Sequence, residues 1–316
     1  TADKLTIVAT GSGAAIGATS AAIETTAAIL DLTTQFNTGT SGAIWIDDKD
    51  TGTTLLDAKT NGGSTVTAGL INITSAAALS IGSVNAVGST GLGNVTLVTT
   101  KNSGVIDEAV NDDAVKISGA VVTLTADGNI GATGDANAYL DVSATTLDVT
   151  TTVNDATTAG GIFLSQKTDQ ATILNVDVTD TTTVGNIFIT SVGDLTVGTV
   201  ISGGGTAKGN VTLATIKVGG VIDDSTAGDD TTVDITGDTV TLDSQGNIGA
   251  TGDGEELDIS AAILDITTTD NGSGTSGSVF IQQTGAADTK LTVDTASVTT
   301  SGTIAIDSAG SLKIDA

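Results

Sequence analysis

The sequence predicts an all-β protein that winds as a right-handed parallel β-helix, a solenoid of short strands. Three observations point to this fold. Val, Ile and Thr, whose branched β-carbons favour strands, are abundant together with the turn formers Gly, Asn and Asp. Related segments recur along the whole 316-residue chain. Within them Leu, Ile and Val exchange at alternate positions, as expected of strands with one face inward. An array of tandem β-sandwich domains is the alternative.

The repeat has a period of 116 to 118 residues. One strand-like segment occurs at Leu5–Thr10, Val122–Asp127 and Val240–Gln245, and a second segment, of the form LD-x-TT, begins at Leu30, Leu147 and Leu264. We therefore expect one continuous solenoid over residues 1–316, made of units 5–121, 122–239 and 240–316. Because the third unit covers about two-thirds of a repeat, we expect a segment of a longer array.

Within each unit the strand-like runs are short and are followed by turn residues, with no helical pattern between them. In the second unit they begin near Val122, Leu140, Leu147, Ile162, Leu174, Ile187, Leu195, Val211, Val221 and Val233. The chain contains no Pro and only six aromatic residues, which suits a narrow aliphatic core whose strands are nearly all internal. The sequence predicts about 20 residues per turn.

The octapeptide GNIGATGD occurs at Gly128–Asp135 and again at Gly246–Asp253. It is predicted to form a corner, in which Gly128, Gly131, Gly246 and Gly249 reach backbone angles closed to other residues. Ile130 and Ile248 are expected to point inward.

Large rings share one column of the repeat, at Trp45, Phe163 and Phe280. We interpret them as fillers of the core or as stacking residues. Aspartates are expected at corners in water, because carboxylates stacked directly on one another repel.

The composition excludes several kinds of chemistry. The chain has no His or Cys, and all ten of its basic residues are Lys. Ser–His and Cys–His nucleophiles and the usual zinc and haem sites therefore cannot form. Two carboxylates would suffice for a glycosidase, so a polysaccharide hydrolase or lyase is an alternative to the non-enzymatic function that we favour.

The aspartates offer a candidate calcium site, because hard cations prefer carboxylate and carbonyl oxygens. Asp107, Asp112 and Asp113 in the first unit recur as Asp223, Asp229 and Asp230 in the second. No EF-hand loop is present in the sequence. The other interpretation is that these residues are solvated turn aspartates that keep the protein soluble.

The net charge of -27 argues against nucleic acid and anionic lipid as partners, since both require clustered basic residues. No apolar run approaches the ~18–20 residues that span a bilayer, so membrane insertion is not expected.

Segments such as GNVTL, GVID, GNIGATGD, LDITTT and DLTVGTV resemble the repeats of large secreted bacterial adhesins of the filamentous-haemagglutinin type, autotransporter passengers and surface-layer-like exoproteins. The resemblance implies a right-handed β-helical shaft, an extracellular or cell-surface location, and a role in adhesion or matrix formation. The expected partners are further repeats, copies joined end to end, and a cell-surface or glycan ligand. A receptor-binding module is another possibility, with Asp47–Ser64 beside Trp45 as its candidate region.

Overall fold

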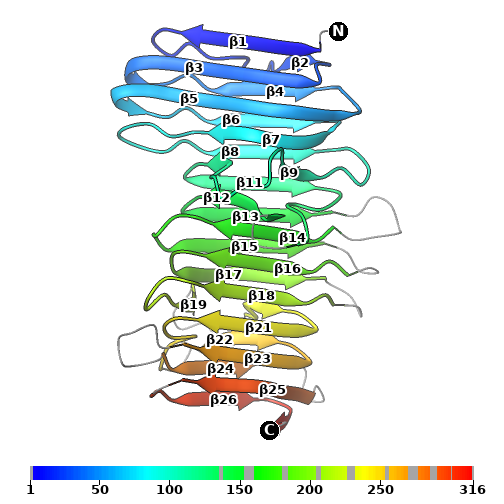
Figure 1. The fold of residues 1–316 in the computed structure, drawn as a ribbon, viewed down its shortest axis with the longest axis vertical. Helices are drawn as coiled ribbons and strands as arrows, with labels where there is room; N and C mark the ends of the chain where they lie inside the picture. Colours follow the sequence, from blue (N-terminus) through cyan, green and yellow to red (C-terminus); the bar gives the residue numbers. More distant parts are fainter. Residues whose placement is uncertain are drawn as a thin grey trace. The chain divides into compact units, whose positions relative to one another are not determined.

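The computed structural model describes residues 3–134, 138–152, 160–179, 184–203, 208–225, 232–252, 256–269, 277–284, 290–299 and 301–314. The protein is all-β, and its parallel strands stack as a β-solenoid of about 11 turns with about 25 residues per turn (Figure 1). The predicted parallel solenoid is confirmed, but its turns are longer than the 20 residues expected. Leu5 pairs with Leu30, and Leu30 with Leu56, which are steps of 25 and 26 residues.

The chain forms two compact units, Thr1–Asp155 with Ala159–Ser165, and Gln166–Ala316 with Ala156–Thr158. The change from one unit to the other falls inside the second sequence copy, not at a boundary of the repeat. Each unit contains two parallel sheets, which we call sheet A and sheet B.

In the first unit, sheet A has the order β1 (Lys4–Thr10), β3 (Ile29–Thr40), β5 (Thr53–Thr67), β7 (Ala78–Asn85), β10 (Ile117–Ser118), β12 (Leu140–Ser143) and β14 (Ile162–Gln166), and β9 (Ile106–Glu108) also pairs with β7. Sheet B has the order β2 (Ile23–Thr25), β4 (Ile44–Asp48), β6 (Ile71–Ser75), β8 (Val95–Thr99), β11 (Val121–Ala126) and β13 (Thr146–Thr151).

In the second unit, sheet A has the order β16 (Ile187–Ser191), β18 (Val211–Thr215), β21 (Thr239–Ser244), β23 (Ile263–Thr268), β25 (Lys290–Val298) and β27 (Ser311–Ile314). Sheet B has the order β15 (Thr172–Val178), β17 (Leu195–Ser202), β20 (Ile235–Thr236), β22 (Leu257–Ser260), β24 (Val279–Gln283) and β26 (Ile304–Ser308), and β19 (Ile222–Asp224) also pairs with β17. All ten strand starts predicted for the second sequence copy lie within two residues of the observed starts of β11 to β20.

The core consists of columns of aliphatic side chains, one from each turn. In sheet B of the first unit one column contains Ile44, Ile71, Val95, Val122 and Leu147, each 0% exposed. A fully buried side chain of this size stabilises the fold by about 1.5–3 kcal/mol relative to an exposed one. Because successive members come from successive turns, each turn depends on the next for its burial.

Equivalent segments of neighbouring sequence copies lie in opposite sheets. In the first unit the segment beginning at Leu5 forms β1 of sheet A, whereas its equivalent at Val122 lies in β11 of sheet B. In the second unit β16 lies in sheet A and its equivalent β26 in sheet B. The first copy holds the ten strands β1 to β10, of which β9 and β10 share one sheet, so it makes nine half-turns. Because one repeat makes four and a half turns, a segment that lies in sheet A in one copy has its equivalent in sheet B in the next copy.

The recurring LD-x-TT segment closes each corner with the same buried hydrogen bond. The hydroxyl groups of Thr34, Thr151 and Thr268 donate to the carbonyl oxygens of Gly42, Gly160 and Gly277 at 2.7, 2.9 and 2.9 Å. All three threonines are 0% exposed. The bond satisfies polar groups that the corner would otherwise bury without a partner.

The octapeptide does form a corner. Its isoleucine makes an isolated β-bridge to the turn before it and another to the turn after it. Ile130 bridges Ile106 and Ile162, and Ile248 bridges Ile222 and Val279. The expected backbone angles were wrong for Gly128 and Gly246, which do not have left-handed φ values. Glycine is required there for space, because an added Cβ would meet the carbonyl oxygens of Ser103 and Gly219 at 2.7 and 2.6 Å.

Gly131 and Gly249 have φ values of 75° and 67°, in the left-handed region. A Cβ there would collide with the carbonyl oxygens of Phe163 and Phe280. Sequence comparison missed a third corner of this kind, in which Gly17 has a φ of 71° and lies against the carbonyl oxygen of Trp45. The aromatic column and the glycine corners are therefore neighbours in all three copies.

The expectation that aspartates lie at corners in water was wrong for several of them. Asp48 is 0% exposed and accepts hydrogen bonds from the hydroxyls of Thr54 and Ser75 at 2.8 and 2.7 Å. Asp141 and Asp258 are 1% and 2% exposed. A buried carboxylate is tolerated where fixed donors or charges replace water.

Replacing Gly249 with Ala should destabilise the second unit far more than replacing Gly219. Both glycines have left-handed φ values, 67° and 71°, but a Cβ at Gly219 meets nothing within 4 Å. Gly219→Ala should therefore cost only the ~1–2 kcal/mol of the backbone conformation, whereas Gly249→Ala adds a collision with backbone. Thermal unfolding of the two variants measures the difference, and equal melting temperatures would contradict this account of the corner.

Candidate functional site

The aspartates proposed as calcium ligands lie in two places where a strand of the solenoid is split. In the first copy the strand is divided into β9 and β10, and residues 109–116 leave the turn between them. Asp107 is half-buried on β9, Asp112 is half-buried in the excursion, and Asp113 is exposed. In the second copy Asp223 is half-buried on β19, whereas Asp229 and Asp230 lie outside the described residues.

The first split strand holds an ion pair that the sequence did not reveal. The Glu108 side chain is 0% exposed and that of Lys116 is 7% exposed, with 3.9 Å between Lys116 Nζ and Glu108 Oε2. Lys116 Nζ also donates to Asp112 Oδ1 at 2.8 Å, and this bond lowers the pKa of Asp112. Lys116 is one of ten lysines in the chain and lies within an acidic segment, which is the only sequence signal of its role.

Burial raises the pKa of the Glu108 carboxyl to about 7, against the opposing effect of Lys116; the charges of Asp141, Asp107 and Asp112 raise it further. Burial also raises the pKa of Asp107, whose Oδ1 accepts the backbone N–H of Glu108 at 2.9 Å. Glu108 is thus a titratable group in the interior of the split strand.

The second copy carries different side chains at the positions equivalent to this ion pair. Asp224 and Asp234 stand where the first copy has Glu108 and Lys116, and Asp258 stands where it has Asp141. Asp234 and Asp258 are 8% and 2% exposed, and the backbone N–H of Asp258 donates to Asp234 Oδ2 at 2.9 Å. The lysine of the first copy is therefore replaced by a carboxylate.

Within the residues that the structure describes, no three His, Cys, Asp or Glu side chains are grouped so that they could hold a metal ion. Asp107, Asp112 and Asp223 instead accept backbone N–H groups, and Asp112 also accepts a hydrogen bond from Lys116. The same part of the chain has no helix of the length and apolar character that a membrane crossing requires.

The aromatic column lies on the outer face of its strands. Along β4 the inward residues are Ile44 and Ile46, and Trp45 between them is half-exposed. Phe280 is likewise half-exposed, whereas Phe163 is 9% exposed. Trp45 and Phe280 therefore cover the outside of the solenoid beside the glycine corners, whereas Phe163 is buried.

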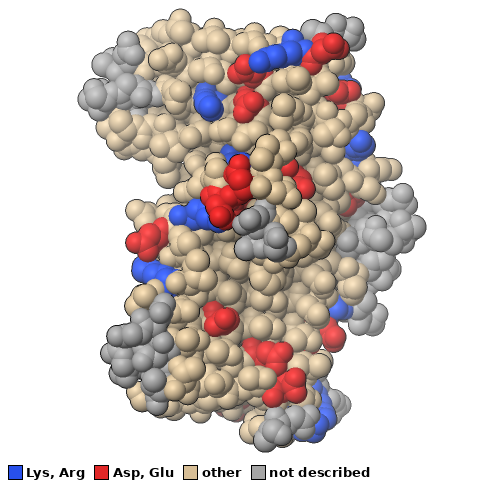
Figure 2. Space-filling view, in the orientation of Figure 1, with Lys and Arg blue, Asp and Glu red and all other residues tan. Residues whose placement is uncertain are grey.

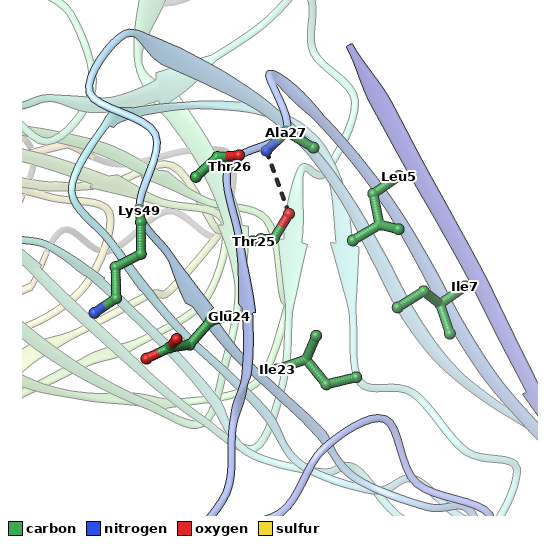
Figure 3. Close-up of a pocket in the computed structure, with 8 residues that line it drawn as sticks. All are labelled: Leu5, Ile7, Ile23, Glu24, Thr25, Thr26, Ala27 and Lys49. Atoms are coloured by element: carbon green, nitrogen blue, oxygen red, sulfur yellow. Dashed lines mark hydrogen bonds between the residues drawn. The ribbon is translucent and has the colours of Figure 1, made fainter. Parts of the chain in front are cut away.

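A hollow of about 450 Å³ opens on the first described turn. Leu5 and Ile7 on β1 and Ile23 on β2 point into it, and Glu24 and Lys49 also line it, from the other side of β2 (Figure 3). Leu5, Ile7 and Ile23 are only half-buried. The hollow is thus the inside of the core, seen from its open end.

Charged side chains occur in small, separate groups on the face shown in Figure 2, with acidic and basic residues side by side and uncharged surface between them. Lys4 pairs with Asp31 at 2.9 Å, and Lys217 lies 3.4 Å from Asp194. Exposed pairs of this kind contribute about 0–1 kcal/mol each to the free energy of unfolding, so they add little to the stability of the solenoid.

Comparison with family models, with curated proteins and with solved structures finds no match for this chain.

Glu108→Gln should flatten the pH dependence of stability. Because the folded pKa of about 7 exceeds the ordinary 4.5, the folded protein binds a proton that the unfolded chain releases between these values. The stabilisation is fully present below pH 4.5 and is lost as the pH rises through about 7. At 1.36 kcal/mol per pKa unit the loss is about 3 kcal/mol at most.

The melting temperature from pH 4 to 8 measures this effect. Wild type should fall relative to Glu108→Gln as the pH rises. Glu24→Gln, which changes an exposed carboxylate on β2, is the matched control and should follow wild type. Parallel profiles for wild type and Glu108→Gln would show that Glu108 does not titrate in this range.

Proposed function

We propose that this chain is a non-catalytic structural and adhesive shaft segment of a large extracellular bacterial surface protein, filament, sheath or surface layer. The observation that carries the proposal is the stacking of parallel turns, in which each turn supplies both the backbone partners and the buried side chains of the next. A chain of this design gains length by adding turns.

The terminal turns support the proposal, because their inward positions are open. Leu5 and Ile7 pair with the buried Leu30 and Leu32 but are half-exposed. At the other end of the described chain, Leu312 and Ile314 pair with the buried Leu291 and Val293 and are 43% and 69% exposed. Open strand edges with exposed aliphatic residues favour addition of further turns, from more repeats or from another copy.

The adhesive part of the proposal rests on the two longest strands of the described chain. Strands β3 and β5 have 12 and 15 residues. Figure 1 shows β3 and β5 extending past the shorter strands around them. The region Asp47–Ser64, which the sequence suggested as a receptor-binding module, contains the end of β4 and most of β5. The edge formed by these long strands is where a cell-surface or glycan ligand would be recognised.

Antibodies against the chain should label intact cells that produce it. An extracellular shaft is accessible without permeabilisation, so immunogold electron microscopy should place the label outside the envelope, on a fibre, sheath or lattice. A cytoplasmic protein of the same cells is the control for intact envelopes. Labelling that appears only after permeabilisation would overturn the proposed location and, with it, the shaft function.

A variant that contains residues 122–239 twice in tandem should be longer by about 22 Å, since four and a half turns are added at ~4.8 Å each. The extra copy joins its neighbours through the same sequence junction that the chain already uses. Small-angle scattering of the variant and of wild type measures the change in maximum dimension. A variant whose extra copy forms a separate globule on a linker would contradict the shaft.

A further inference from the structure

The inward side chains of the first turn are more exposed than those of its two internal equivalents, which a neighbouring turn covers. Leu5 and Ile7 correspond to Val122 and Leu124 in the second copy, and to Val240 and Leu242 in the third. All four internal residues are 0% exposed, whereas Leu5 and Ile7 are half-exposed and line the hollow of Figure 3.

The turn that covers the internal equivalents is of the same type in both copies. Strand β8 pairs with β11 and places Val95 beside Val122 and Leu97 beside Leu124. Strand β18 pairs with β21 in the same way, with Val211 beside Val240 and Leu213 beside Leu242. These covering strands carry the same inward Val and Leu at the same spacing.

The second strand of the first turn, β2, also has internal equivalents that are covered by a strand of the neighbouring turn. Thr25 on β2 corresponds to Val142 on β12 and Ile259 on β22. Ile117 of β10 pairs with Val142, and Ile235 of β20 pairs with Ile259. The next inward position confirms the alignment, because Ala27, Ala144 and Ala261 are all 2% exposed.

We propose that the hollow on the first turn is a binding site for one further turn of this repeat, of the type formed by residues 94–118 and 210–236. Its Val and Leu cover Leu5 and Ile7, and its Ile covers Thr25. The backbone edge of β1 supports this, because β1 pairs with β3 on one side, whereas β11 and β21 pair on both sides. The inference rests on the proposed shaft function and names the partner of one of its ends.

The chemistry of the hollow suits this occupant. Leu5, Ile7, Ile23 and Ala27 present apolar surface, and the Thr25 hydroxyl accepts the backbone N–H of Ala27 at 3.2 Å. The strand that would cover β1 is uncharged in both copies, as GNVTL at Gly93–Leu97 and at Gly209–Leu213. Its Val and Leu side chains can therefore pack on Leu5 and Ile7 without burying a charge of their own strand, whereas Glu24 and Lys49 line the side of the hollow next to β2.

The test adds a second copy of residues 86–120 directly before Lys4 of the full chain. The added turn should slow hydrogen exchange of the β1 amides at least tenfold and raise the melting temperature of the first unit. In the matched control, the added turn carries Asp in place of its copies of Val95 and Leu97, so that it has the same length but cannot fill the hollow. Exchange in β21 and β23 serves as the internal reference for folding.

Slow exchange in the extended chain, with exchange in the control unchanged from wild type, supports the proposal. Equal exchange of β1 in the extended chain and in wild type overturns it, as does equal protection by the native and the Asp-containing turns. These outcomes are independent of the labelling of intact cells, so a failure here leaves the shaft function open to its own test.

Discussion

The structure depends on aliphatic side chains of one turn packing against those of the next. Neither a strand nor a single turn of this chain can enclose a core alone, because its inward residues are covered only by the turns before and after it. The columns through Ile44 and Ile71 in the first unit and through Ile187 and Val211 in the second show the same arrangement. Stability is therefore local and additive along the solenoid, and it falls where a neighbouring turn is missing.

The corners allow this stacking to continue without interruption. A narrow parallel coil must turn its backbone sharply and bury polar groups as it does so. Glycine at positions such as Gly131 supplies the backbone angle and the close approach, and threonine at positions such as Thr151 supplies the hydrogen bond. The conservative exchanges between copies occur at the inward aliphatic positions, where volume matters more than identity.

The half-integral number of turns in each repeat determines which sheet carries each outward residue. Because a copy makes nine half-turns, an outward residue of one copy has its equivalent on the opposite sheet in the next. Trp45 lies in sheet B, whereas its equivalent Phe163 lies in sheet A of the same unit. The solenoid therefore carries equivalent outward positions of neighbouring copies on both of its sheets.

The sequence by itself determined the all-β class, the parallel solenoid, the repeat and the positions of the strands, since these depend on alternation and turn residues that neighbouring positions encode. It also located the glycine corners at Gly131 and Gly249. Only the tertiary structure decided the length of a turn, the sheet to which each strand belongs, the outward orientation of Trp45 and the meeting of Glu108 with Lys116. These features depend on which residues pair across about 25 positions of chain, and that register is set by the stacking of whole turns, not by any local pattern.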